Sequence, residues 1–206
     1  MDPPTTPNPF PFTTGNETHT FTIDESLQTY TLPLKPYLNE TLPSHQAQGL
    51  TPSGICTSTL IFNQQGHLLL LQRASHDSMP NRWEPPGGSV DSADASILHA
   101  AARELWEEAG LVASRFRTRV SGLGREGDFF WNQNRSRCFC RAVFVVEVVD
   151  STHVRLDPNE HQAFAWATEE DIRSQTLDGR PLPITNDAMK TILLESFRLR
   201  RELNKL

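Results

Sequence analysis

The sequence of 206 residues has few cysteines, no long apolar run and no excess of positive charge. Its three cysteines, Cys56, Cys138 and Cys140, are odd in number and lack zinc-ligand spacing, which argues against a disulfide framework or a zinc site. No segment approaches a membrane span, and residues 1–20 lack the basic and apolar regions of a secretory signal. We therefore expect an intracellular protein, cytoplasmic with the nucleus left open, that has no membrane partner.

The charge balance is acidic, with a formal net charge of −6 at pH 7. Proteins that coat nucleic acid or anionic lipid carry the opposite charge, so we expect no nucleic-acid partner. An anionic ligand would need help from a cation, and a divalent metal ion supplies it. The length suits one core rather than two, and it leaves a homodimer open.

The organisation of the chain changes near residue 50. Residues 1–50 begin with a stretch rich in proline and threonine, and we expect them to form a partly flexible N-terminal extension. Residues 21–40 alternate in part and are expected to form a short element that packs on the main body. Residues 51–206 are expected to form one α/β domain that includes a C-terminal helix. Within it, apolar periodicity and turn residues predict a hairpin over 55–62 and 67–73, a helix over 92–110, strands over 137–150 and 163–168, and an amphipathic helix over 186–206.

Residues 103–111 read RELWEEAGL and place three carboxylates on one helical face. At about 100° per residue, Glu104, Glu107 and Glu108 share an arc with Arg103, while leucine and alanine fill the opposite side. Like charges on one face repel unless a cation lies among them. A solvated helix face is the alternative for the triplet alone. The preceding glycine turn, which lets backbone approach a ligand, instead favours Mg²⁺ or Mn²⁺ holding phosphate oxygens.

Residues 87–111, GGSVDSADASILHAAARELWEEAGL, resemble the signature box of the Nudix hydrolase family. That pattern has a glycine, a glutamate after five residues, and, after seven more, Arg-Glu, an aliphatic residue, any residue, Glu-Glu, any residue, glycine and an aliphatic residue. Residues 103–111 match its second half at every fixed position. In the first half we interpret Asp94 as standing in the glutamate position, with one residue inserted before Arg103.

The resemblance extends over residues 53–175 and implies an α/β/α sandwich around a mixed β-sheet. It also implies a divalent cofactor, Mg²⁺ or Mn²⁺, and hydrolysis of a diphosphate joined to another group. On this reading the metal ligands are Glu104, Glu107, Glu108 and Gly88. The guanidinium of Arg103 would steady the carboxylates by paired hydrogen bonds.

The reaction also needs a group that accepts a proton from the attacking water. A box glutamate, Glu104 or Glu107, is one candidate. Members of the family often use an acid from a later loop, and Glu160 matches that position; a surface glutamate is the alternative reading there. We expect the adjacent His161 to be solvent-exposed, although a role as ligand or polar contact stays open.

Aromatic and cationic residues would hold the rest of the substrate by stacking on a base and pairing with phosphate. The candidates are Arg73, Arg82, Trp83, Phe130 and Trp131. Packing of a long loop onto the core is the alternative for the aromatic residues. We predict a small-molecule substrate, a nucleoside diphosphate derivative, which is cleaved by attack of water at phosphorus.

Two other functions stay open. The displaced first half of the box makes a catalytically silent ligand-binding or regulatory module conceivable, because fold alone does not guarantee activity. The other is chemistry on a non-nucleotide diphosphate, either hydrolysis of a prenyl or inositol diphosphate or isomerisation of an isoprenoid diphosphate. The isomerase would need a reactive cysteine, for which Cys56 is a weak candidate.

Overall fold

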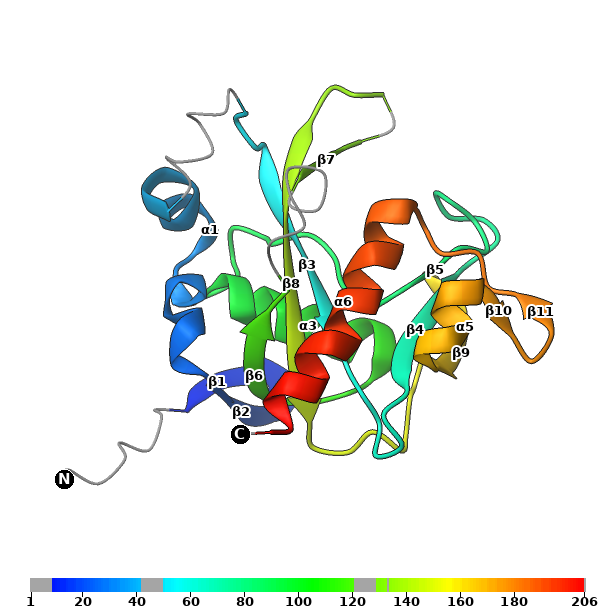
Figure 1. Ribbon diagram of the computed structural model, residues 1–206. Helices are drawn as coiled ribbons and strands as arrows, with labels where there is room; N and C mark the ends of the chain where they lie inside the picture. Colours follow the sequence, from blue (N-terminus) through cyan, green and yellow to red (C-terminus); the bar gives the residue numbers. More distant parts are fainter. Residues whose placement is uncertain (1–8, 42–49, 121–128, 133, 206) are drawn as a thin grey trace.

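The computed structural model describes residues 9–41, 50–120, 129–132 and 134–205. A mixed β-sheet forms the middle layer, with helix α3 (Ile97–Ala109) on one face and helix α6 (Asp187–Leu203) on the other (Figure 1). The strands follow the order β1-β2-β6-β8-β3, with β7 also paired to β8. Their bounds are β1 (Phe10–Thr14), β2 (Glu17–Ile23), β6 (Ala113–Arg119), β8 (Cys138–Val148), β3 (Gly54–Leu60) and β7 (Phe129–Trp131). The expected α/β/α sandwich is confirmed.

Strand β8 shows how both faces of this sheet are buried. Side chains alternate along a strand, so Val143 and Val145 join the core cluster that contains Ile192 of α6. Phe144 and Val146 point the other way, into the cluster that contains the apolar face of α3. Burial on both sides explains why this stretch is a nearly continuous apolar run in the sequence.

A second sheet, in the order β5-β4-β9, consists of β4 (Leu68–Arg73), β5 (Trp83–Glu84) and β9 (His161–Ala167). The predicted hairpin over 55–62 and 67–73 is wrong apart from one antiparallel bridge between Phe62 and Leu68. Strand β3 instead pairs in parallel with β8, and β4 pairs with β9. Both partners come from far along the chain, so local turn residues could not reveal the pairing.

Helix α3 begins at Ile97 rather than at residue 92. The hydroxyl of Ser96 caps the helix by accepting a hydrogen bond from the backbone N–H of His99 at 3.2 Å. Gly110 ends the helix as predicted, in a left-handed conformation with φ of 67° that favours glycine. Residues 92–96 therefore belong to the loop that precedes the helix.

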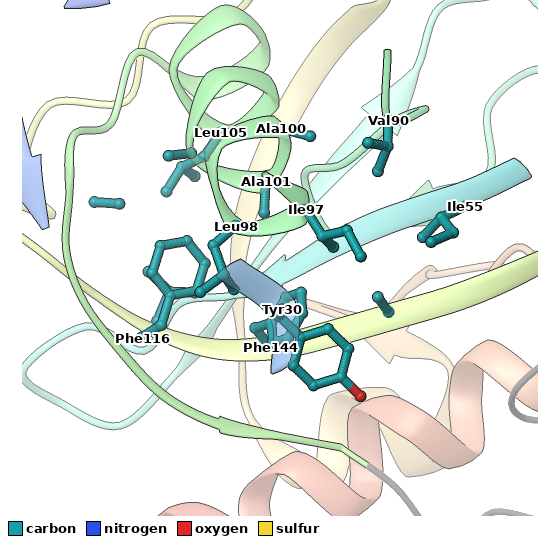
Figure 2. Close-up of a cluster of buried hydrophobic side chains, with 14 of the residues drawn as sticks. Tyr30, Ile55, Val90, Ile97, Leu98, Ala100, Ala101, Leu105, Phe116 and Phe144 are labelled. Carbon is teal, nitrogen blue, oxygen red and sulfur yellow. The ribbon is translucent and has the colours of Figure 1, made fainter. Parts of the chain in front are cut away.

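The apolar face of α3 packs on the sheet (Figure 2). Leu98 and Ala101 share one buried cluster with Phe116 and Phe144, and all four side chains are fully buried. Burying a leucine of this kind stabilises a fold by about 1.5–3 kcal/mol. The same contact fixes the direction in which the opposite, charged face of the helix points.

The N-terminal segment joins the same core. Strands β1 and β2 form a hairpin, β2 runs parallel to β6, and three short helical turns follow, namely η1 (Glu25–Thr31), α1 (Leu34–Pro36) and η2 (Tyr37–Thr41). Phe21, Leu27 and Tyr30 are buried in the cluster that contains α3. The short element expected in this region thus packs on the domain, and the boundary at residue 50 stays a prediction.

The C-terminal part supplies the layer opposite α3. Helix α5 (Glu169–Ser174), the hairpin of β10 (Thr176–Leu177) and β11 (Arg180–Pro181), and α6 follow β9. Asn186 caps α6, and Ile192, Leu193 and Phe197 are buried, as the amphipathic pattern predicted. Over the ranges that the structure describes, no helix combines the length and apolarity needed to cross a membrane.

Candidate functional site

The glycine turn that leads towards α3 contacts the carboxylates of that helix. The backbone N–H of Gly87 donates to a carboxylate oxygen of Glu108 at 2.7 Å. A methyl group placed on Gly88 would lie 2.6 Å from the carboxylate of Glu104. The turn and the helix therefore form one surface, on which backbone and carboxylate oxygens lie close together.

Arg103 binds carboxylates on both sides of it. Its Nε and Nη2 each donate to Asp94 at 3.0 Å, and its Nη1 donates to Glu104 and Glu107, both at 2.9 Å. A planar guanidinium suits such paired bonds, and the bonds to Asp94 are the main reason why the pKa of Arg103 is raised. Asp94 is the residue that we interpret as standing in the first acidic position of the box, and that interpretation stays a prediction.

Glu108 is the most deeply buried of the three helix carboxylates, with 5% of its surface exposed. Burial raises its pKa well above the ordinary value, and the nearby carboxylates of Glu104, Glu160 and Glu84 raise it further. Burial also raises the pKa of Glu104, although Arg103 opposes that shift. Carboxylates that burial and mutual repulsion destabilise as anions are suited to a hard divalent cation, so these residues fit Mg²⁺ or Mn²⁺.

A second wall comes from the β5-β4-β9 sheet. Arg73, at the end of β4, forms ion pairs with Glu84 of β5 and with Asp77 of the following loop. Sequence reasoning had marked Arg73 as a substrate-binding candidate but missed Asp77, whose signal was its place four residues after Arg73. Both carboxylates neutralise the guanidinium of Arg73. The ion pair with Arg73 in turn holds Glu84 beside the site.

Glu160 and His161 lie where the second wall meets the carboxylates. One oxygen each of Glu108 and Glu160 and one ring nitrogen of His161 all lie within 4.8 Å of one another. Glu160 is exposed, but His161 is only 2% exposed, so the expectation of a solvent-exposed histidine is wrong. The cause is a β-bulge, because β9 skips Gln162 and pairs His161 directly with Arg73.

The other predicted substrate-binding residues are dispersed. Trp83 points away from Glu84 along β5 and borders a cavity of about 590 Å³ between β9 and the β10–β11 hairpin. Arg82 is exposed and reaches the carbonyl of Ile184 at 3.5 Å. The ring of Phe130 stacks on Phe139 and lies under a guanidinium, whereas Trp131 on β7 is 52% exposed.

The two glycines of the turn predict different mutational effects. Gly88→Ala is expected to lower activity by about 10–100-fold at nearly unchanged melting temperature, because the new methyl displaces only the end of the flexible Glu104 side chain. Gly87→Ala would place its methyl 2.1 Å from the backbone oxygen of Thr57 at φ of 156°, so unfolding is expected. Melting curves and rates for both variants check this; a Gly88→Ala enzyme of full activity would contradict the close approach.

Comparison with known proteins accords with this geometry. The family model for the NUDIX domain matches residues 52–187. An uncharacterized Nudix hydrolase, NudL, of Enterobacter sp. (strain 638) is 40% identical over 97 residues, which are 46% of this chain and 46% of the relative. A NudL of Escherichia coli O1:K1 is 37% identical over 100 residues, 48% of each chain. This chain thus matches about half the length of these curated relatives.

Solved structures show the same fold. A MutT protein from Methanosarcina mazei Go1 is similar with a TM-score of 0.52 at 27% identity, covering 73% of this chain and 96% of that one. A C. elegans Ap4A hydrolase has a TM-score of 0.53 at 21% identity, covering 72% and 98% of the two chains. Since the NUDIX model spans the glycine turn, α3 and the second wall, the chain belongs to the Nudix family.

Proposed function

We propose that this protein is a divalent-metal-dependent pyrophosphohydrolase that cleaves a diphosphate linkage in a nucleoside diphosphate derivative. The observation that carries the proposal is the buried carboxylate of Glu108, which lies among Glu104, Glu160 and Glu84 and has its pKa raised by burial and by those neighbours. Such an arrangement costs stability, and a bound cation would offset that cost. Membership of the Nudix family, whose named relatives are hydrolases, supports the reaction class.

The residues divide the chemical tasks among themselves. Glu104, Glu107 and Glu108, with the backbone at Gly88, would hold the cation, which supplies positive charge against the diphosphate oxygens. Arg103 fixes the directions of Glu104 and Glu107 through its Nη1. The exposed carboxylate of Glu160 is the candidate that accepts a proton from water as the water attacks phosphorus.

The contacts of Asp94 weigh against a catalytically silent module. The side chain of Asp94 is 8% exposed and accepts two hydrogen bonds from Arg103. The backbone N–H of Asp91 also donates to Asp94 at 2.8 Å, which ties this carboxylate to the loop. The arginine is therefore supported from the loop side despite the inserted residue, and the carboxylates that it orients keep their arrangement.

The surroundings of Cys56 weigh against isomerase chemistry. Its Sγ lies 3.7 Å from Oγ of Ser89, and burial raises the pKa of the thiol. A reactive cysteine needs a lowered pKa, because the thiolate is the nucleophile. A raised pKa disfavours the thiolate of Cys56, which favours hydrolysis over isomerisation.

Trp131 is the best placed of the predicted residues for stacking on a base. Trp131 lies on β7, which pairs with the start of β8, and that part of β8 pairs with the start of β3. The same end of β3 bridges to Ser89 through Cys56, and the carbonyl of Ser89 accepts a hydrogen bond from Arg103. Trp131→Ala is expected to raise KM by about three- to tenfold with kcat unchanged, since stacking contributes about 0.5–1.5 kcal/mol. Val149→Ala, at a position that is 72% exposed at the other end of β8, is the control. Steady-state kinetics would contradict the role of Trp131 if both variants behaved alike.

The position of attack can be tested directly. Turnover in water enriched in ¹⁸O is expected to place the label in a phosphate oxygen of one product, as mass spectrometry would detect. Label found only in an alcohol or sugar product would show attack at carbon and would contradict the proposed reaction.

A further inference from the structure

His161 carries two polar ring nitrogens into the interior of the protein. It is 2% exposed, and neither Nδ1 nor Nε2 has a hydrogen-bond partner among the described residues. A neutral imidazole carries one donor and one acceptor. Leaving a buried polar atom unpaired costs about 1–3 kcal/mol, so a pair of them in one ring calls for a partner that binds from outside the chain.

The protein groups nearest this ring are carboxylates. Nε2 lies 3.8 Å from the Glu84 carboxylate, which is too long for a hydrogen bond, and Glu84 is already paired with Arg73. The oxygens of Glu108 and Glu160 complete a triangle of atoms within 4.8 Å of one another. Ligands of one cation at about 2.1 Å lie roughly 3–4 Å apart, so a small movement of the exposed Glu160 would close the triangle.

The backbone holds His161 in this orientation. Its N–H donates to the carbonyl of Asp157 at 2.9 Å, and the carbonyl of Glu160 accepts from the N–H of Ala74 at 2.8 Å. Together with the bulge at Gln162, these bonds fix the loop to β4. The ring therefore reaches the carboxylates without loop movement, as a metal ligand requires.

We infer that His161 is a nitrogen ligand to a cation shared with Glu108 and Glu160, and that it makes this position prefer a first-row transition ion such as Mn²⁺ over Mg²⁺. Mg²⁺ takes oxygen ligands in a strict octahedron, whereas imidazole suits transition metals. Glu160 binds through one oxygen and keeps the other for the proton. The inference rests on the proposed function, because it concerns the cation of that same site.

The test is pulsed electron paramagnetic resonance on the full chain loaded with Mn²⁺ alone. A directly bound imidazole gives a ¹⁴N hyperfine coupling, which is expected in the native protein and which changes to that of ¹⁵N after histidine labelling. His161→Gln should abolish the coupling and weaken Mn²⁺ binding by at least about tenfold, with a smaller effect on Mg²⁺. His153→Gln, at a side chain that is 89% exposed, should change neither.

The native spectrum can overturn the inference by itself, even if His161→Gln fails to fold. Absence of nitrogen coupling, or coupling that persists in His161→Gln, would overturn the inference. Because the readout is binding, it separates the two proposals: coupling without hydrolysis of any diphosphate would keep the ligand and remove the hydrolase. Hydrolysis without coupling would do the reverse.

Discussion

Glu108→Gln is expected to lower diphosphate hydrolysis by about 10³-fold while stabilising the metal-free protein. The loss of rate follows because a neutral amide cannot neutralise a cation, and removing one preorganised electrostatic group commonly costs about 10²–10³-fold. The gain in stability follows because the variant no longer buries a charge among Glu104, Glu160 and Glu84. Relief of this kind commonly contributes about 0.5–2 kcal/mol to the free energy of unfolding.

The difference in unfolding free energy between Glu108→Gln and the native protein should increase from acidic to neutral pH. The pKa of Glu108 is raised in the folded protein above its ordinary value of 4.5. Below that value both states hold the proton and the difference is small. It grows as pH rises from the ordinary value to the folded pKa, because only the unfolded chain loses the proton in that range, and it stays constant above the folded pKa. Urea unfolding of the metal-free proteins from acidic to neutral pH checks this.

The same substitution elsewhere serves as the control. Glu170→Gln changes a side chain that is 78% exposed on α5 and should alter neither rate nor stability measurably. Glu107→Gln should also abolish turnover, but without the gain in stability, because Glu107 is 47% exposed. A Glu108→Gln protein with native activity would remove this residue from the reaction.

Removal of divalent cations is expected to have the second large effect. EDTA should abolish turnover, and saturation of the metal-free protein with Mn²⁺ at about 100 times its dissociation constant should add about 2.7 kcal/mol to the stability. For a chain of this length that corresponds to a rise in melting temperature of about 5–10 °C. The cation is expected to stabilise because it neutralises buried carboxylates that otherwise repel one another.

The Glu108→Gln variant distinguishes this effect from general binding of ions. Its melting temperature should rise much less with Mn²⁺, whereas that of Glu170→Gln should rise as in the native protein. Differential scanning calorimetry with and without the ion measures both. An equal rise in all three proteins would show that the cation binds elsewhere.

The sequence predicted those parts of the fold whose causes are local. The end of α3 depends on Gly110, and α6 depends on apolar periodicity, so both were recognisable. The pairing of β3 with β8 was not, because it joins segments 85 residues apart and one strand pattern suits many partners. The packing of Phe21 under α3 was indicated only as a short element that packs on the domain.

The candidate site likewise contains residues that local sequence placed correctly and residues whose position depends on long-range strand pairing. The spacing of residues 103–111 placed Glu104, Glu107 and Glu108 on one face, since helical geometry is fixed by the chain. The burial of His161 required a bulge in β9 and its pairing with Arg73, neither of which leaves a local signal. Trp83 neighbours Glu84 in sequence, yet strand alternation turns it to the opposite side of the sheet, so its part in substrate binding stays a prediction.

The most direct test is a phosphate-release assay on a mixed panel of diphosphates with Mg²⁺ or Mn²⁺. The panel contains ADP-ribose, nucleoside diphosphate sugars, diadenosine polyphosphates, coenzymes, nucleoside triphosphates, diphosphoinositols and prenyl diphosphates. We predict turnover of a nucleoside diphosphate derivative that both EDTA and Glu108→Gln abolish. Absence of turnover on every compound, from folded protein that binds Mn²⁺, would contradict the hydrolase and favour a silent binding module.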